Sequence, residues 1–298
     1  MSEVDAIQNG DGSPIVINEV VGFIGAGNMA KAIAFSLLKK GILTPENVLA
    51  SAKTQTNIKD WEALQCETTL NNEDLLQKAD IIIWAVKPQM FPGVINSLKK
   101  VVEGGSVTCR TVMHVSVMAG ITLTNFSAQI QSVTGEEGSS RCFRTMPNIG
   151  LEVNCGVTVF SGPADTTDAE RNLLNNIFKP IGLFYEVPEG QINAYGGLFG
   201  SGIGFMFPII EALSDGAVKV GIPRNISLEI AAQVMKGAGE LILQKKKHPG
   251  AMKDAVCSPG GTTIAGIAAL ENGGVRSAVI KAVEAATLRG EELGKAAK

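Results

Sequence analysis

A short apolar segment that runs directly into closely spaced glycines constrains the fold more than any other part of the sequence. Residues 20–25 read Val-Val-Gly-Phe-Ile-Gly, as expected of a buried strand, and residues 25–30 read Gly-Ala-Gly-Asn-Met-Ala. The second segment fits the pattern G-x-G-x-x-A, and the residues that follow place Ala30, Ile33 and Leu37 on one helical face. A strand, a tight glycine turn and a helix in this order are typical of a dinucleotide-binding unit.

The turn supplies what a pyrophosphate requires. Its glycines permit a tight bend and a close approach of the backbone, while the free N–H groups of the following helix stabilise negative charge. A glycine-rich turn without a ligand is the alternative interpretation of this pattern. We assign the whole turn to cofactor binding, namely Gly25, Ala26, Gly27, Asn28 and Met29.

The segment that would meet the adenosine ribose contains no carboxylate. It reads Val48-Leu-Ala-Ser51-Ala-Lys53-Thr-Gln-Thr56. An acidic side chain here would accept hydrogen bonds from a ribose 2′-hydroxyl, whereas hydroxyls and an ammonium favour a 2′-phosphate. NADPH is therefore the predicted electron donor and NADH the alternative. Lys53 is assigned to cofactor binding, although an ordinary solvated loop lysine would look the same.

A second apolar run ends abruptly beside the expected crevice. Residues 80–86 read Asp-Ile-Ile-Ile-Trp-Ala-Val, typical of a strand covered on both faces, and Lys87-Pro88 ends it. Ligands of parallel sheets bind at the carboxyl ends of the strands, which places Val86, Lys87 and Pro88 at the cofactor. The Val-rich segment 107–115 leads to Met118-Ala-Gly-Ile-Thr122, another strand end that can face the same crevice.

The second half of the chain becomes helical. Segments 157–160 and 181–187 resemble late strands, and helical periodicity dominates after Pro188. We expect three parts: an acidic, disordered leader at 1–18, an NADP(H)-binding domain at 19–180, and a helical domain at 181–298 that binds substrate and dimerises. The fold class is α/β, with a Rossmann-type, mostly parallel sheet followed by the helical domain. A monomeric helical cap is the alternative to a dimer.

Composition limits the partners. The net charge of −3 and pI of about 5.6 offer no basic field for nucleic acid. The five cysteines are scattered and fit neither a disulfide framework nor a zinc site, so we expect no metal and a cytoplasmic location. The longest apolar run, residues 196–210, is shorter than a membrane span, and we expect a buried helix there and no membrane partner.

A loop near the C-terminus places hydroxyls and glycines at the start of a helix. Residues 258–263 read Ser-Pro-Gly-Gly-Thr-Thr and precede an apolar helix. Unpaired N–H groups at such a helix start stabilise an anion, and a substrate carboxylate is the natural guest. The alternative is that Ser258 or Thr262 merely caps its own helix. The two histidines, His114 and His248, lack carboxylates at helical spacing and are expected to be structural or solvated.

With both halves in view, the chain resembles the pyrroline-5-carboxylate reductase family from about residue 20 to about residue 292. The resemblance is carried by Phe23-Ile-Gly-Ala-Gly-Asn-Met-Ala30, Ala85-Val-Lys-Pro88, Ala119-Gly-Ile-Thr122, Asp215-Gly-Ala-Val-Lys-Val-Gly-Ile-Pro223, His248-Pro-Gly and Lys253-Asp-Ala-Val-Cys-Ser-Pro-Gly-Gly-Thr-Thr263. It implies NAD(P)H-dependent reduction of the C=N bond of 1-pyrroline-5-carboxylate to L-proline, the last step of proline biosynthesis. It also implies a helical domain that interleaves with a second subunit, in a homodimer that assembles into higher homo-oligomers.

The resemblance also implies roles for individual residues. Substrate would bind to Ser258, Gly260, Gly261, Thr262 and Thr263, with the Thr263 hydroxyl near the ring nitrogen as the catalytic group. Ser51 and Asn72 would contact the ribose and its phosphate, and Val86, Lys87, Pro88 and Ala119 would line the nicotinamide side. A protonated cyclic imine accepts hydride directly, so the protein supplies position and electrostatics more than acid or base.

Some positions depart from the family pattern. Phe199 stands where Ser is common, Ile203-Gly204-Phe205 replaces Pro-Ala-Tyr, and Ile149-Gly150 replaces Thr-Pro. We expect these residues on the elements that wall the substrate. The alternatives are therefore a divergent member that acts on another imine or a hydroxy acid, and a non-catalytic NADPH-binding scaffold. A hydroxy-acid dehydrogenase needs a Lys or His as proton carrier, and residues 191–217 contain neither.

Overall fold

A computed structural model describes residues 15–105, 107–135 and 140–296. The chain forms two compact units. One contains the sheet, extends to Gly200 and includes the end of the chain from Arg289 onwards, and the other is helical and spans Ser201–Leu288. Each unit is described by itself below.

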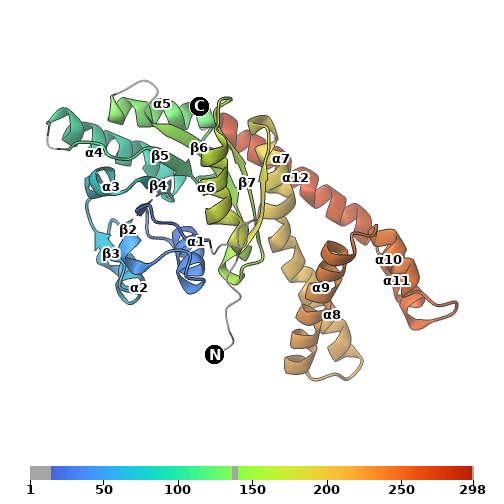
Figure 1. The fold of residues 1–298 in the computed structure, drawn as a ribbon. Helices are drawn as coiled ribbons and strands as arrows, with labels where there is room; N and C mark the ends of the chain where they lie inside the picture. The colour runs from blue at the N-terminus through green and yellow to red at the C-terminus, as the bar shows by residue number, and fades with distance from the viewer. Residues whose placement is uncertain (1–14, 106, 136–139, 297–298) are drawn as a thin grey trace. The chain divides into compact units, whose positions relative to one another are not determined.

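The first unit is built on one eight-stranded sheet (Figure 1). The strand order is β3-β2-β1-β4-β5-β6-β7-β8, and every neighbouring pair is parallel except β6 with β7. The strands are β1 (Val21–Ile24), β2 (Val48–Ser51), β3 (Glu67–Thr69), β4 (Ile81–Trp84), β5 (Met113–Ser116), β6 (Arg141–Pro147), β7 (Gly156–Ser161) and β8 (Gly182–Glu186). The predicted mostly parallel, Rossmann-type sheet is confirmed.

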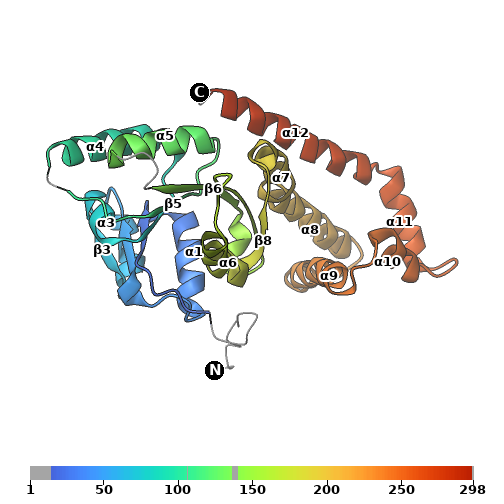
Figure 2. The same ribbon diagram turned by 45° about the horizontal axis from the view of Figure 1, so that its top comes forward.

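Helices cover both faces of this sheet. The helices on one face are α1 (Asn28–Lys39), α2 (Lys59–Glu62) and α6 (Asp168–Phe178), and those on the other are α3 (Glu73–Lys78), α4 (Phe91–Glu103) and α5 (Leu123–Thr134). Figure 2 shows α4 and α5 together along one face. Single-turn helices connect these elements: η1 (Pro45–Asn47), η2 (Gln55–Asn57), η3 (Pro88–Met90), η4 (Ile149–Val153), η5 (Lys179–Ile181) and η6 (Glu189–Gln191).

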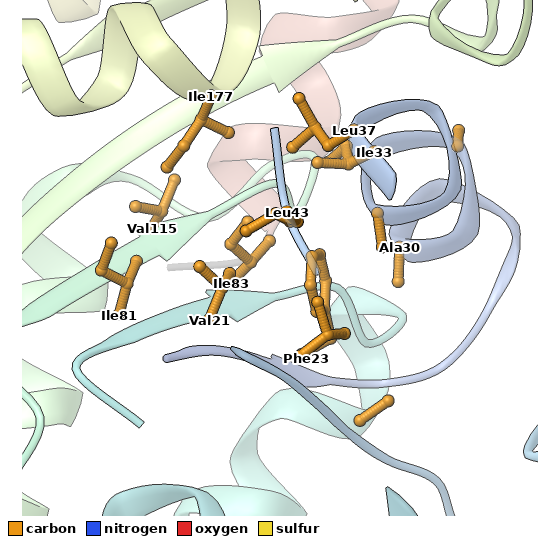
Figure 3. Packing of buried hydrophobic residues seen from close by; sticks show 14 of the residues in the cluster. Val21, Phe23, Ala30, Ile33, Leu37, Leu43, Ile81, Ile83, Val115 and Ile177 are labelled. Atoms are coloured by element: carbon orange, nitrogen blue, oxygen red, sulfur yellow. The ribbon is translucent and has the colours of Figure 1, made fainter. Parts of the chain in front are cut away.

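Alternate residues of each central strand enter different cores. Val21 and Phe23 of β1 pack with Ile33 of α1, as Figure 3 shows, whereas Ile24 packs with the helices of the opposite face. Because both faces are covered, strands such as β4 are apolar at every position. This explains why residues 80–86 read as a continuous apolar run.

The unit is larger than the domain predicted at 19–180. Of the predicted leader, residues 1–14 lie outside the described part of the chain. Ile17 is buried, and its N–H donates to the carbonyl of Ile42 at 2.9 Å, so residues 15–18 belong to the folded unit. At the other end β8 pairs with β7, and α7 (Ile192–Tyr195) and a π-helical turn, η7 (Gly196–Gly200), follow before the division at Gly200.

The second unit is helical. It contains α8 (Gly202–Lys219), α9 (Arg224–Lys245), α10 (Pro249–Ala255), α11 (Thr262–Asn272) and most of α12 (Val275–Ala296). Of its described residues only Ser214, Ser227 and Ala231 are buried. Large apolar side chains are exposed along its helices, including Phe207, Ile230, Val234, Leu241 and Ile280.

The prediction of a buried helix at residues 196–210 is therefore wrong for the single chain. Gly197 and Phe199 are buried, but Phe207 is 61% exposed. The continuous helical stretch Glu189–Lys219 is also long and apolar enough to cross a membrane by length and composition alone. Among the described residues, exposed apolar side chains in this number mark a surface for interaction with another protein or a membrane.

Candidate cofactor and substrate site

The glycine turn after β1 has the geometry that its sequence predicts. Gly25 has a φ of +101°, and its N–H donates to the carbonyl of Ser51 at 3.1 Å. A Cβ atom at this position would lie 2.8 Å from the carbonyl oxygen of Ala85 and 2.9 Å from the nitrogen of Val86. Glycine is therefore required here both by the backbone angle and by the close approach of the chain after β4.

Gly27 is not required by the protein's own packing. It is the N-cap of α1 with a φ of −83°, and a Cβ atom placed on it would meet no protein atom within 4 Å. No side chain caps α1, and its first turn contains no acidic residue, so the first N–H groups of the helix are free to bind an anion. The open space and these donors fit a dinucleotide pyrophosphate over Gly25–Met29.

The end of β2 presents a cation and no carboxylate. Lys53 is exposed and has no ion-pair partner among the described residues. The hydroxyl of Ser51 is fully buried and donates to Asn72 Oδ1 at 2.7 Å, so it orients Asn72 instead of facing solvent. A ribose contact at this position would be made by Asn72, which is partly exposed. The preference for a 2′-phosphate rests on Lys53 and stays a prediction.

A cavity of about 900 Å³ opens at the carboxyl ends of β4 and β5. Pro88 and Ala119 line it together with Phe91, Asn125 and Met146. Two of the residues predicted to face the nicotinamide thus share one cavity, and Val86 adjoins Gly25 at the glycine turn. The roles assigned to these residues are supported by this placement but remain predictions.

A buried ion pair that no sequence pattern indicates holds the loop beside this cavity. Arg144 of β6 is buried and donates to Glu189 Oε1 at 3.2 Å, and the same oxygen accepts from the N–H of Leu123 at the start of α5. Burial lowers the pKa of Arg144, while the hydrogen bond to Glu189 opposes that shift. The pair fixes the loop that ends at Thr122. Its members are 45 residues apart in sequence, so no local pattern identifies them.

The predicted substrate turn lies in the helical unit. Gly260 has a φ of +68°, and the N–H of Gly261 donates to the carbonyl of Ser258 at 3.0 Å. Gly261 is the N-cap of α11, and no side chain caps this helix. The alternative in which Ser258 or Thr262 caps its own helix is therefore not what the structure contains. The N–H groups of the first turn, which includes Thr262 and Thr263, remain free for an anion.

The two histidines are structural, as expected. His114 is fully buried in β5, accepts a hydrogen bond from the indole of Trp84 at 3.2 Å, and burial lowers its pKa to about 3. His248 is the N-cap of α10, where its Nδ1 accepts from the N–H of Gly250 at 3.1 Å. Among the residues that the structure describes, neither histidine forms an ion pair with a carboxylate.

The side chain of Phe199 is buried in the sheet-bearing unit. Its side chain packs with Val159, Val187 and Ile192, and its carbonyl accepts from the amide of Asn148 at 3.1 Å. Its replacement of a small family residue therefore fills a core behind the π-helical turn. Ile203-Gly204-Phe205 belong to the helical unit, and their place in the substrate wall stays a prediction.

Comparisons with known proteins match both halves of the chain. Residues 189–293 match the profile described as pyrroline-5-carboxylate reductase dimerisation, and residues 20–109 match that described as NADP oxidoreductase, coenzyme F420-dependent. The chain is 39% identical to pyrroline-5-carboxylate reductase 3 of Rattus norvegicus over 92% of its length and 96% of that protein. It is 38% identical to pyrroline-5-carboxylate reductase of Methanosarcina acetivorans over 93% of its length and 99% of that protein.

Solved structures give the same result. A pyrroline-5-carboxylate reductase from Coxiella burnetii matches with a TM-score of 0.80 and 29% identity, covering 93% of this chain and 99% of that one. The NADP-bound pyrroline carboxylate reductase of Plasmodium falciparum matches with a TM-score of 0.78 and 26% identity, covering 94% and 99%.

Proposed function

The chain belongs to the pyrroline-5-carboxylate reductase family, and on that premise we propose that it reduces the C=N bond of 1-pyrroline-5-carboxylate to L-proline, the last step of proline biosynthesis. It is an NAD(P)H-dependent oxidoreductase, and NADPH is the proposed donor because Lys53, and no carboxylate, follows β2. The observation that carries the proposal is the uncapped start of α11 at the Ser-Pro-Gly-Gly-Thr-Thr turn, which offers anion donors without an acid or base.

The chain's own residues have two proposed roles, cofactor binding and substrate binding. The turn at Gly25–Met29 holds the pyrophosphate, and Val86, Pro88 and Ala119 form a surface for the nicotinamide. Bound NADPH supplies the hydride that the imine carbon accepts. The N–H groups at Thr262 and Thr263 bind the substrate carboxylate, and the Thr263 hydroxyl orients the ring nitrogen. Because the imine nitrogen is already basic, positioning provides several kcal/mol of the rate enhancement.

The assay follows NADPH oxidation with DL-pyrroline-5-carboxylate and measures L-proline as product. Thr263→Ala should lower kcat while NADPH binding is unchanged. Thr287→Ala is the matched control, because Thr287 bonds only to the carbonyl of Val283 within its own helix. Tight NADPH binding with no imine-dependent oxidation would favour the scaffold alternative, and oxidation of a hydroxy acid in its place would favour a dehydrogenase.

The exposed apolar helices support a homodimer built through the helical unit, with higher homo-oligomers assembled from it. The family profile for dimerisation matches residues 189–293 and so includes the apolar helical stretch Glu189–Lys219. We therefore propose that a second subunit, and not a membrane, covers this stretch. All five cysteines are free thiols, which supports a cytoplasmic location. Light scattering after gel filtration measures the mass, and a monomer at micromolar concentration would contradict the dimer.

A further inference from the structure

We propose that Trp61 is a positioning residue for the cofactor: its indole holds the peptide between Ala26 and Gly27 so that the Gly27 N–H faces the pyrophosphate. The indole nitrogen Nε1 donates to the carbonyl oxygen of Ala26 at 3.4 Å. Trp61 belongs to α2, 35 residues from Ala26, and lies outside the glycine pattern. The inference rests on the proposed use of a nicotinamide dinucleotide.

Trp61 is itself held rigidly. Its side chain has 0% exposure, and its ring lies 5.2 Å from that of Phe23 and 5.0 Å from that of Phe35, measured between centroids. Asp60, its neighbour on α2, forms an ion pair with Lys31 of α1. The indole is thus fixed against both β1 and α1, the two elements that the glycine turn connects. A donor held in this way can determine the orientation of a more mobile group.

The geometry of the peptide bond transmits this orientation to the ligand. In a trans peptide the C=O and the following N–H point in opposite directions and rotate together. When Trp61 binds the Ala26 carbonyl, the Gly27 N–H of the same plane is directed away from the indole. That N–H has no partner among the described residues, and the space beside Gly27 is free of protein atoms within 4 Å of an added Cβ.

The turn needs such a restraint because of its glycines. Gly27 has a wide range of accessible backbone angles, so the plane before it can rotate at little energetic cost. A rotated plane would present the Ala26 carbonyl, an acceptor, to an anionic group. Trp61 opposes that rotation from the inner side of the turn. Its contribution should therefore appear in the affinity for pyrophosphate-containing ligands.

The chain provides a matched control in its only other tryptophan, Trp84. This indole is equally buried and donates to His114 instead of to the glycine turn. The experiment compares Trp61→Phe and Trp84→Phe in the full-length protein. Dissociation constants for NADPH, NADH and adenosine 2′-monophosphate are measured by calorimetric titration, and KM for pyrroline-5-carboxylate is measured separately.

Trp61→Phe should raise the dissociation constants of NADPH and NADH by the same factor, about three- to tenfold, as expected for one lost hydrogen bond. Adenosine 2′-monophosphate has no pyrophosphate, so its affinity should change by less than about twofold. KM of Trp61→Phe for pyrroline-5-carboxylate should stay within about twofold of the unmodified protein, because Trp61 contacts the glycine turn and not the predicted substrate turn. All affinities of Trp84→Phe should likewise stay within about twofold, because Trp84 bonds to His114 instead of to the glycine turn. Unchanged NADPH affinity, or an equal loss for the monophosphate, overturns the inference.

A second variant guards against misfolding of Trp61→Phe. In the Trp84→Phe background, benzothienylalanine incorporated at position 61 keeps the shape of the indole and removes only its N–H. The same three- to tenfold loss of dinucleotide affinity is expected, and its absence refutes the role of the N–H. Because these readouts are binding constants, a protein that binds NADPH but does not reduce the imine would contradict the proposed function and leave the Trp61 test intact.

Discussion

Replacing Gly25 or Gly27 with alanine separates folding from cofactor binding within one turn. At Gly25 the φ of +101° disfavours alanine by roughly 1–2 kcal/mol, and displacing the backbone around a Cβ that lies 2.8 Å from the Ala85 oxygen adds roughly 1–3 kcal/mol. Gly25→Ala should therefore lose about 2–5 kcal/mol of stability. For a unit of this size that corresponds to a fall in Tm of about 5–15 °C.

Gly27→Ala should behave in the opposite way. The φ of −83° suits alanine, and no protein atom lies within 4 Å of the added methyl group, so the stability without cofactor should change by less than about 1 kcal/mol. The methyl group projects into the space assigned to the pyrophosphate. The affinity for NADPH should fall at least about tenfold, an energetic loss of about 1.4 kcal/mol.

The assay measures thermal unfolding of each variant with and without NADPH. At a concentration 100 times the dissociation constant, NADPH stabilises the unmodified protein by about 2.7 kcal/mol, and this increment should shrink for Gly27→Ala. Gly93→Ala is the control, because Gly93 also has open space around it but lies in α4, away from the turn. A Gly25→Ala variant with an unchanged Tm, or a Gly27→Ala variant with unchanged NADPH affinity, would refute the reasoning.

Three further predictions concern charged and titratable groups. Folding holds the pKa of His114 near 3, below its unfolded value of about 6.5, so the stability that the neutral imidazole provides is full above pH 6.5 and falls by about 2 kcal/mol at pH 5. Denaturant unfolding should therefore show a smaller loss of stability between pH 7.5 and pH 5 for His114→Gln than for the unmodified protein. An equal loss in both proteins would contradict this. Lys53→Ala should raise KM for NADPH about three- to tenfold and leave KM for NADH unchanged, because only NADPH carries the 2′-phosphate; equal effects on both cofactors would remove the assignment. Glu189→Ala leaves Arg144 buried without its partner and should lower stability by roughly 3 kcal/mol, whereas a Tm within 1 °C of the unmodified protein would show that the pair contributes little.

Local chemistry explains which parts of the site could be predicted from the sequence. The glycine turn is recognisable because a positive φ and a close backbone approach restrict the residue type at Gly25 itself, while Gly27 leaves open space at the start of α1. The same holds for Gly260, whose φ of +68° marks the second turn. Features of this kind are determined within a few neighbouring residues, so the sequence indicates them directly.

Other features depend on contacts between residues that are far apart in the sequence, and no local pattern indicates them. Ser51 is buried and its hydroxyl donates to Asn72, 21 residues away, a pairing that no local pattern indicates. Trp61 and Glu189 act on segments even farther along the chain. The exposure of Phe207 also differs from the prediction of a buried helix, because an apolar side chain can be covered by another molecule instead of by its own chain. Periodicity reports that a face is apolar but not which molecule covers it.

The path of the chain also has a practical consequence for altering this protein. The helical unit occupies residues 201–288, and the last helix, α12, begins in that unit and ends among residues that cluster with the sheet. The chain leaves the sheet-bearing unit after residue 200 and returns to it at residue 289, so the helical unit is an insertion within that unit. A stop codon shortly after residue 288 would therefore remove the part of α12 that clusters with the sheet-bearing unit.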